Sequence, residues 1–219
     1  MDRKDSFFKN AFLGRERRGY HHGNLKDALI EAARSLMSER GAAGFTLADA
    51  ARLAGVTAAA PYRHFSDRNA LMAELARRGF DLFGQRLAGA WNNGQPDPVT
   101  ALRRMGDAYL AFAREEPGLY GAMFGNVGAL SVPEAGAAAD KALALLRVAC
   151  DAVLRQRGGT IENGRKLTFE IWSLSHGVAT LALAGHLDPA HEGCDPAAIL
   201  ASGVASLIEM AARRPAAAK

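Results

Sequence analysis

The stretch that decides the fold runs from Thr46 to Asn69 and reads TLADAARLAGVTAAAPYRHFSDRN. Its start has the pattern of a capped helix, because Thr46 can accept a hydrogen bond from the first turn while Asp49, three residues on, reaches back to a free amide. Gly55 favours a tight turn, and Thr57 is a suitable cap for a second helix. Two short helices joined in this way have the outline of a helix-turn-helix, which places its second helix in the major groove of DNA.

The second helix supplies most of the predicted DNA contacts. Tyr62 and Thr57 suit phosphate oxygens, Arg63 can bind a guanine edge with two hydrogen bonds, and an alanine methyl can pack against a thymine methyl. The residues predicted to contact DNA here are Thr57, Ala58, Ala59, Tyr62, Arg63 and His64. An alternative is that Tyr62 and His64 only pack in the core. The ring of Pro61 would oppose the carbonyl of Thr57, so we expect this helix to start late or to kink.

Basic residues before and around this stretch extend the predicted DNA surface. Thr46 and Arg68 each lie near a helix start, where phosphate binds well. An N-terminal arm that contains Arg15, Arg17, Arg18 and Tyr20 can contact phosphates or the minor groove, or is a disordered basic leader. Residues 1–78 carry 14 Lys and Arg against 9 Asp and Glu, a net +5, whereas the whole chain is +4. The positive charge therefore lies where a polyanion partner is expected.

Composition indicates an all-α protein. The chain has 219 residues, of which 49% are hydrophobic, and alanine dominates while β-branched residues are few. Two cysteines exclude a disulfide framework, and the charged start has no secretory signal. The longest apolar stretch, Val178–Ala184, is too short to cross a bilayer. We therefore expect a soluble cytoplasmic protein that does not associate with membranes.

Helical periodicity and turn signals predict about nine helices. Two lie in the opening stretch, and the others span about 24–40, 67–90, 99–116, 119–124, 133–156, 166–184 and 196–214. Trp91–Pro98 is the strongest break, and Gly158-Gly159 and Asn163-Gly164 are predicted to bracket a turn. The predicted division is a basic arm and helix-turn-helix domain (1–66), a connecting helix (67–90), a helical ligand-binding and dimerisation domain (91–214) and a frayed tail (215–219).

Taken in order, these motifs resemble those of the TetR family of bacterial transcriptional regulators. The resemblance covers about Tyr20 to Ala76 and rests on the runs TLAD from Thr46, AGVT from Ala54, YRHF from Tyr62, and Ala70-Leu71. A second, shorter resemblance lies at Trp172-Ser-Leu-Ser-His176-Gly177, which is similar to the W-x-x-x-H-G element of one branch of the family, the WHG type.

The resemblance implies a homodimer formed by the last two helices, two reading helices roughly 34–36 Å apart, and hence a palindromic double-stranded operator. It also implies a pocket for a small hydrophobic or aromatic effector whose binding lowers operator affinity. The candidates for the pocket are Met105, Tyr109, Phe112, Tyr120, Phe124, Phe169, Trp172 and His176. Aromatic residues at helical spacing are also typical of plain core, and the alternative for His176 is a satisfied structural histidine beside Trp172.

Two other classes of function remain as alternatives. An enzyme would need a nucleophile or cofactor cradle, but the sequence has no G-x-S-x-G, Walker loop, G-x-G-x-x-G or paired zinc cysteines, so no catalytic residue and no cofactor are predicted. The loop from His186 to Asp195 gathers metal-capable residues, yet Asp195 stands where H-E-x-x-H needs its second histidine, so no metal site is predicted. An architectural DNA binder without effector would have an empty, well-packed C-terminal core.

Overall fold

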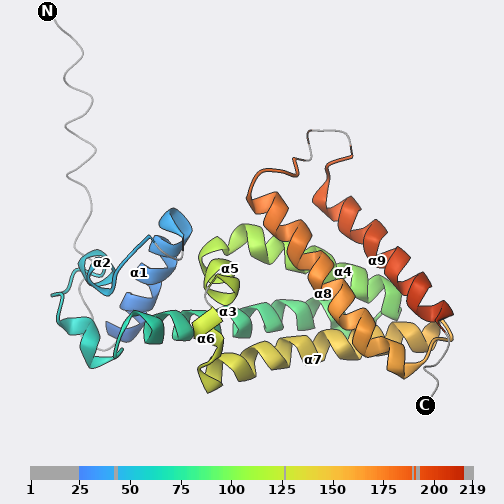
Figure 1. The fold of residues 1–219 in the computed structure, drawn as a ribbon, viewed down its shortest axis with the longest axis horizontal. Coiled ribbons are helices and arrows are strands. Elements are labelled where there is room, and N and C mark those ends of the chain that lie inside the picture. Colours follow the sequence, from blue (N-terminus) through green and yellow to red (C-terminus); the bar gives the residue numbers. More distant parts are fainter. Residues whose placement is uncertain (1–24, 42–43, 126, 189, 191–192, 215–219) are drawn as a thin grey trace, which may run out of the picture.

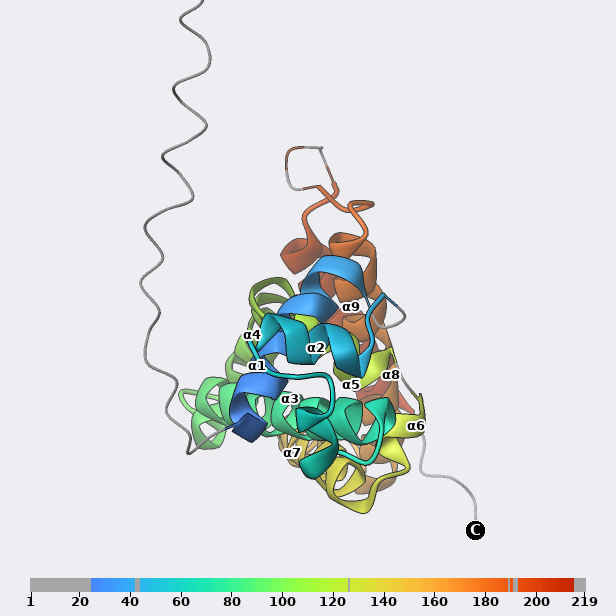
Figure 2. The same cartoon turned by 90° about the vertical axis from the view of Figure 1, so that its left-hand side faces the viewer.

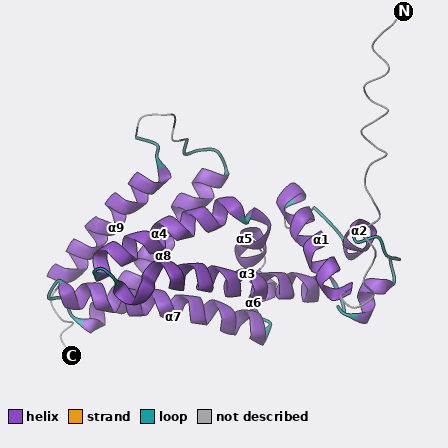
Figure 3. Ribbon diagram, turned by 180° about the vertical axis from the view of Figure 1, so that it is seen from behind, coloured by secondary structure: helices purple, strands orange, loops and turns teal. Residues whose placement is uncertain are grey.

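A computed structural model describes residues 25–41, 44–125, 127–188, 190 and 193–214. Over these residues the protein is helical and contains no strand, which confirms the predicted all-α fold (Figure 3). The elements in chain order are α1 (Leu25–Arg40), α2 (Leu47–Leu53), the 3₁₀ helix η1 (Ala60–Arg63), α3 (Arg68–Trp91), η2 (Asn92–Gly94), α4 (Pro98–Glu115), α5 (Pro117–Phe124), α6 (Val127–Leu130), α7 (Pro133–Gln156), α8 (Ile161–Leu183) and α9 (Pro196–Arg213).

Helix α3 is the long axis on which the rest of the molecule is assembled (Figure 1). It begins where the Asp67 side chain accepts a hydrogen bond from the Ala70 amide at 2.9 Å. α1 and α2 lie at its N-terminal end, and α4, α5 and α7 pack along it. One apolar cluster runs from Leu29 of α1 through Leu75 of α3 to Ile208 of α9, so both ends of the molecule share a core.

The late start expected for the second helix of the helix-turn-helix is confirmed, while two other predictions about helix starts are wrong. Thr57 does not cap this helix, which is the 3₁₀ helix η1 capped at Ala59 without a side-chain bond, and Pro61 lies at its start, where a missing amide costs nothing. α8 begins at Ile161, so Asn163 lies inside it rather than in a turn. The Asn163 side chain donates to the carbonyls of Ala211 and Arg214, each at 3.1 Å, and this tertiary contact outweighs the turn signal.

The contact between α1 and α5 is unusually close and is allowed by glycine. A Cβ at Gly118 would overlap the backbone carbonyl of Arg34, and one at Gly121 would lie 3.0 Å from the Met37 Cε. Beside this contact the Glu116 carboxylate, which is 12% exposed, bridges Arg34 of α1 at 2.5 Å and Arg86 of α3 at 3.3 Å. We call these residues the α1–α5 seam, and it ties the N-terminal helices to the body.

Candidate functional sites

Residues 46–68, which we call the head, are held together by local capping interactions. The Thr46 hydroxyl accepts a hydrogen bond from the Asp49 amide at 3.1 Å, and the Asp49 carboxylate accepts one from the Thr46 amide at 2.8 Å, which completes the predicted capping box. Gly55 follows with a φ of +74°, a conformation that favours glycine. The chain then turns into η1, so the predicted order of helix, glycine turn and second helical segment is present.

Every residue predicted to contact DNA within this second segment is exposed: Thr57, Ala58, Ala59, Tyr62, Arg63 and His64. Tyr62 is 63% exposed, so the alternative that it packs in the core is wrong. Pro61 and Phe65, in contrast, are buried and anchor the segment from beneath. Figure 2 looks onto this end of the molecule, with α1 and α2 nearest the viewer. The head therefore presents a polar surface on an apolar support.

Two other predicted DNA contacts occupy different surroundings. Thr46 is exposed at the start of α2. Arg68 is half-buried: its Nε donates to the Phe45 carbonyl at 3.0 Å, and its guanidinium lies 4.9 Å from the Phe45 ring centroid. Arg68 thus ties α3 to the residue before α2. The predicted arm contacts Arg15, Arg17, Arg18 and Tyr20 lie outside the described residues.

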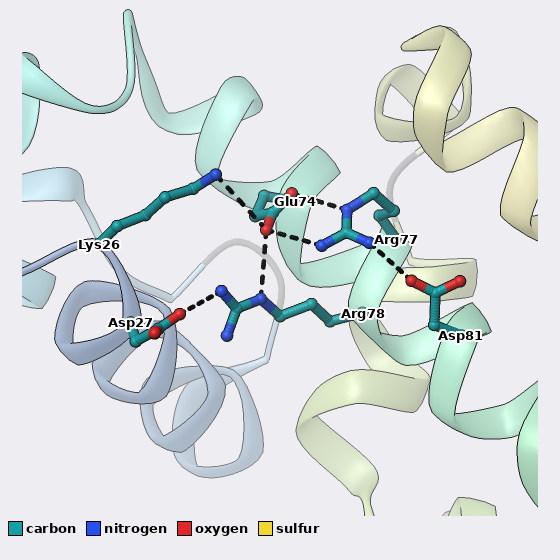
Figure 4. Close-up of polar contacts among 6 residues, drawn as sticks. All are labelled: Lys26, Asp27, Glu74, Arg77, Arg78 and Asp81. Atoms are coloured by element: carbon teal, nitrogen blue, oxygen red, sulfur yellow. Dashed lines mark hydrogen bonds and ion pairs between the residues drawn. The ribbon is translucent and has the colours of Figure 1, made fainter. Parts of the chain in front are cut away.

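An ion-pair cluster holds α1 against α3 behind the head (Figure 4). The Glu74 carboxylate, 15% exposed, accepts two hydrogen bonds from Arg77 at 2.8 and 2.9 Å and one from Arg78 at 3.2 Å. Lys26 of α1 lies 3.6 Å from the same carboxylate, and Arg78 also pairs with Asp27 of α1. The hydrogen bonds from Arg77, opposed by burial, lower the pKa of Glu74 to about 2. We call this set the Glu74 cluster.

The body encloses an apolar cavity of about 290 Å³. Its wall comes from helices α3 to α9, and its residues are Phe80, Phe83, Leu87, Leu102, Met105, Gly106, Tyr109, Met123, Phe124, Leu130, Ala139, Asp140, Ala142, Leu143, Leu146, Ile171, Trp172, Ser175 and Val204. The volume is at the lower end for small-molecule sites, and an apolar wall with few polar groups is typical of such sites. The cavity thus has the size and chemistry of a site for a small apolar ligand.

A chain of polar side chains lies at one side of this cavity. The hydroxyls of Tyr109 and Tyr120 lie 3.3 and 2.8 Å from Nδ1 of His176, and Trp172 lies beside the Tyr109 hydroxyl. Burial lowers the pKa of His176 and raises the pKa of both tyrosines, so the imidazole is neutral and the tyrosines are protonated near pH 7. In the tautomer with its proton on Nε2, Nδ1 accepts a hydrogen bond from the nearer hydroxyl, that of Tyr120.

The predicted pocket residues divide into three groups. Met105, Tyr109, Phe124 and Trp172 line the cavity. Phe112, Tyr120 and His176 do not line it: Phe112 is fully buried, and the other two form the polar chain, which supports the structural interpretation of His176. Phe169 is 43% exposed and is not brought to the cavity. Phe80 and Phe83 were missed because the apolar face of a connecting helix gives no sign that it faces a cavity.

Comparison with known proteins assigns these two sites to a family. The protein-family model described as "Bacterial regulatory proteins, tetR family" matches residues 29–75. The family model described as "Tetracyclin repressor-like, C-terminal domain" matches residues 102–207. The chain belongs to the TetR family. The first match contains α2 and η1, and the second contains most of the cavity and the Trp172–Gly177 element. This TetR-family chain is therefore a DNA-binding transcriptional regulator, and regulators of this family act as dimers.

Solved structures share the fold. A protein of unknown function from Rhodococcus sp. RHA1 is 26% identical with a TM-score of 0.74, and the match covers 90% of this chain and 100% of that one. The fatty acid degradation regulator FadR from Bacillus halodurans is 16% identical (TM-score 0.68, covering 85% and 95%). The TetR-family regulator PfmR from Thermus thermophilus is 19% identical (TM-score 0.62, covering 83% and 97%). Comparison with curated proteins found no match to this sequence.

The last two helices form an outer layer with a largely open face. α9 is long and apolar enough to cross a membrane by length and composition alone, and few of its residues are buried. A single such helix is weak evidence for a membrane, because a helix that packs against a partner has the same composition. On α8 the exposed apolar residues are Phe169, Leu181 and Leu183, and Gly177 faces open space.

Proposed function

We propose that this regulator is a ligand-responsive repressor, which leaves a palindromic operator when a small hydrophobic or aromatic effector fills the cavity. The proposal rests on one observation. Two parts of the molecule, α3 and the α1–α5 seam, connect the end that carries the exposed η1 surface with the helices that line the cavity. The cavity also disfavours the architectural alternative, which calls for a well-packed body. As a member of this family, the regulator is expected to act in the cytoplasm.

In this proposal η1 makes the direct contacts with DNA. Tyr62, Arg63 and His64 project from a segment fixed by buried Pro61 and Phe65, so their positions are set before DNA binds. Arg63 is the candidate for a guanine edge, and Thr57 and Tyr62 for phosphates. Because η1 is a single 3₁₀ turn, we expect few base contacts in each half-site and a short consensus.

In this proposal α5 transmits the effect of ligand binding from the cavity to α1. Met123 and Phe124 of this helix line the cavity, while Gly118 and Gly121 of the same helix contact α1 without spare room. A ligand that displaces α5 therefore has to displace α1 and the Arg34–Glu116–Arg86 bridge with it, since close-packed groups do not deform continuously. Phe80 and Phe83 give a second connection through α3. The coupling required is modest, roughly 1–3 kcal/mol.

Dimerisation falls to α8 and α9. The exposed apolar residues of α8 and the open space at Gly177 allow the close approach of a second copy, as tight helix packing requires. Two-fold symmetry then places two η1 segments on one face of DNA and makes the operator palindromic.

The test is selection of bound sequences from a random DNA library at fixed salt, with wild type, Arg63→Ala and the control Arg52→Ala. Arg52 is also exposed on the head but pairs with Asp49. We expect a palindromic consensus from wild type and Arg52→Ala, and a loss of about 10- to 100-fold in affinity for that consensus in Arg63→Ala. Salt-sensitive binding without a consensus would contradict the proposal and favour an architectural role.

A further inference from the structure

The wall of the cavity offers a ligand almost no unsatisfied hydrogen-bonding group. The Ser175 hydroxyl donates to the Ile171 carbonyl at 2.8 Å. The Tyr109 hydroxyl is engaged with His176, and the Trp172 indole lies beside that hydroxyl. The wall therefore recognises the body of a ligand by shape and apolar contact, and five aromatic rings, those of Phe80, Phe83, Tyr109, Phe124 and Trp172, favour a flat, ring-containing body.

The charge around the cavity has one sign. Among its lining residues Asp140 is the single ionisable group that is charged near pH 7, and no lysine, arginine or histidine is included. His176, the nearest base in the polar chain, has its pKa lowered by burial and adds no positive charge. An anionic ligand would thus meet an apolar wall and a carboxylate, with no cation to compensate for its lost hydration.

Asp140 lies at the mouth of the cavity. It is exposed, as is Leu130 of α6, another lining residue, at 38%. A Cβ at Gly136 would lie 3.1 Å from the Leu130 carbonyl oxygen, so the end of α6 lies against α7 one helical turn before Asp140. Asp140 forms no ion pair with any other described residue. Its carboxylate is therefore available to a ligand whose body occupies the cavity behind it.

We propose that the effector is a small aromatic amine, whose rings fill the cavity and whose protonated nitrogen pairs with Asp140 at the mouth. This assignment rests on the proposed effector site and narrows its ligand class. An ammonium group keeps part of its hydration at the mouth, so the ion pair needs no full desolvation. The same carboxylate repels carboxylates and phosphates, which gives the site discrimination by charge as well as by shape.

The test compares three probes with one ring system and different charge: 1-naphthylmethylamine, 1-naphthalenemethanol and 1-naphthoate. Their affinities for the full-length protein are measured by calorimetry at pH 7 and low salt, without DNA. We expect the amine to bind about fivefold more tightly than the alcohol and at least tenfold more tightly than the carboxylate. Equal affinity of amine and alcohol, or tightest binding of the carboxylate, would overturn the assignment.

Asp140→Asn tests whether the Asp140 carboxylate causes the preference for the amine. Its control is Asp107→Asn on α4, which removes an exposed carboxylate outside this cavity. The first variant should lose the preference for amine over alcohol and bind the alcohol as before, while the control should behave as wild type. A retained preference in Asp140→Asn would overturn the role of this residue. These titrations contain no DNA, so they test the ligand assignment independently of the proposed repressor function. The repressor function is contradicted if a bound amine leaves operator affinity unchanged.

Discussion

The head and the cavity use polar side chains in opposite ways. On η1 the polar groups are exposed and the apolar residues beneath them, Pro61 and Phe65, supply the anchorage. Around the cavity the polar groups of Tyr109, Tyr120 and His176 satisfy one another, and the apolar side chains face the ligand. A surface that binds DNA needs hydrogen-bond donors and acceptors that are free to reach the DNA. A wall that holds an apolar ligand needs its polar groups to be hydrogen-bonded to one another. The contrast teaches which substitutions alter binding and which alter stability.

The largest expected effect comes from removing the anchorage of the head. Phe65→Ala takes a large ring from a site that is 4% exposed, and should lower the free energy of unfolding by about 3–4 kcal/mol. Tyr62→Ala, on the same segment but 63% exposed, should change it by less than about 0.5 kcal/mol. Urea unfolding followed by circular dichroism measures both. Similar losses in the two variants would contradict the division between anchor and reader.

A second change fills the cavity while the head is left intact. Ala139→Phe places a ring among the lining residues and should weaken binding of 1-naphthylmethylamine at least tenfold. Because the added ring occupies the place of the effector, this variant should also bind the operator more weakly than wild type in the absence of ligand. Ala137→Phe adds the same ring to an exposed position of α7 and should bind the probe as wild type does. Calorimetry and fluorescence anisotropy of labelled operator give the two readouts. Undiminished probe binding in Ala139→Phe would place the ligand elsewhere.

The Glu74 cluster, which lies between the two regions, predicts a dependence of stability on pH. Glu74→Gln removes a carboxylate whose pKa is lowered from 4.5 to about 2 by Arg77, so wild type should be more stable by about 1–2 kcal/mol at pH 7. For a depressed carboxyl pKa, this advantage is complete above about pH 4.5 and is lost as the pH falls toward 2. Unfolding midpoints of both proteins between pH 7 and 3 measure it. A constant difference over that range would contradict the assignment.

The smallest effect is expected in the polar chain of the body. Tyr120→Phe removes the hydroxyl that donates to His176 at 2.8 Å, and should lower the free energy of unfolding by about 0.5–1.5 kcal/mol. Tyr62→Phe removes an exposed hydroxyl and should leave stability unchanged. With one donor lost, the pKa of His176 should rise in Tyr120→Phe, which NMR titration of the imidazole can follow. An unchanged His176 pKa would show that the hydroxyl does not favour the neutral ring.

Local signals in the sequence were sufficient for most of the fold. The Thr46–Asp49 capping box, the turn at Gly55 and the start of a helix near residue 67 were all predicted, because each depends on neighbours within four residues. Predictions failed where distant contacts decide the outcome. Asn163 and Gly164 look like a turn, but carbonyls 48 and 51 residues away hold Asn163 in a helix.

The candidate sites were predicted unevenly for the same reason. The DNA-reading residues follow one another in the sequence, so a motif finds them, and only the replacement of an α-helix by η1 required the structure. The cavity gathers residues from α3 to α9, and periodicity shows that a residue is buried without showing whether it faces a cavity or another side chain. Phe80 and Phe83 were therefore missed, and Asp140 has no sequence signal of its own.

The most direct test of the account is hydrogen exchange of the full-length protein with and without its selected operator, in wild type and in Arg63→Ala. If the head and the cavity form one coupled unit, binding of DNA to η1 should change exchange in α5 and in the part of α8 that carries His176, and Arg63→Ala should abolish the change. Changes confined to residues 46–68, with α5 and α8 unaffected, would contradict the coupling and leave two independent sites on one chain.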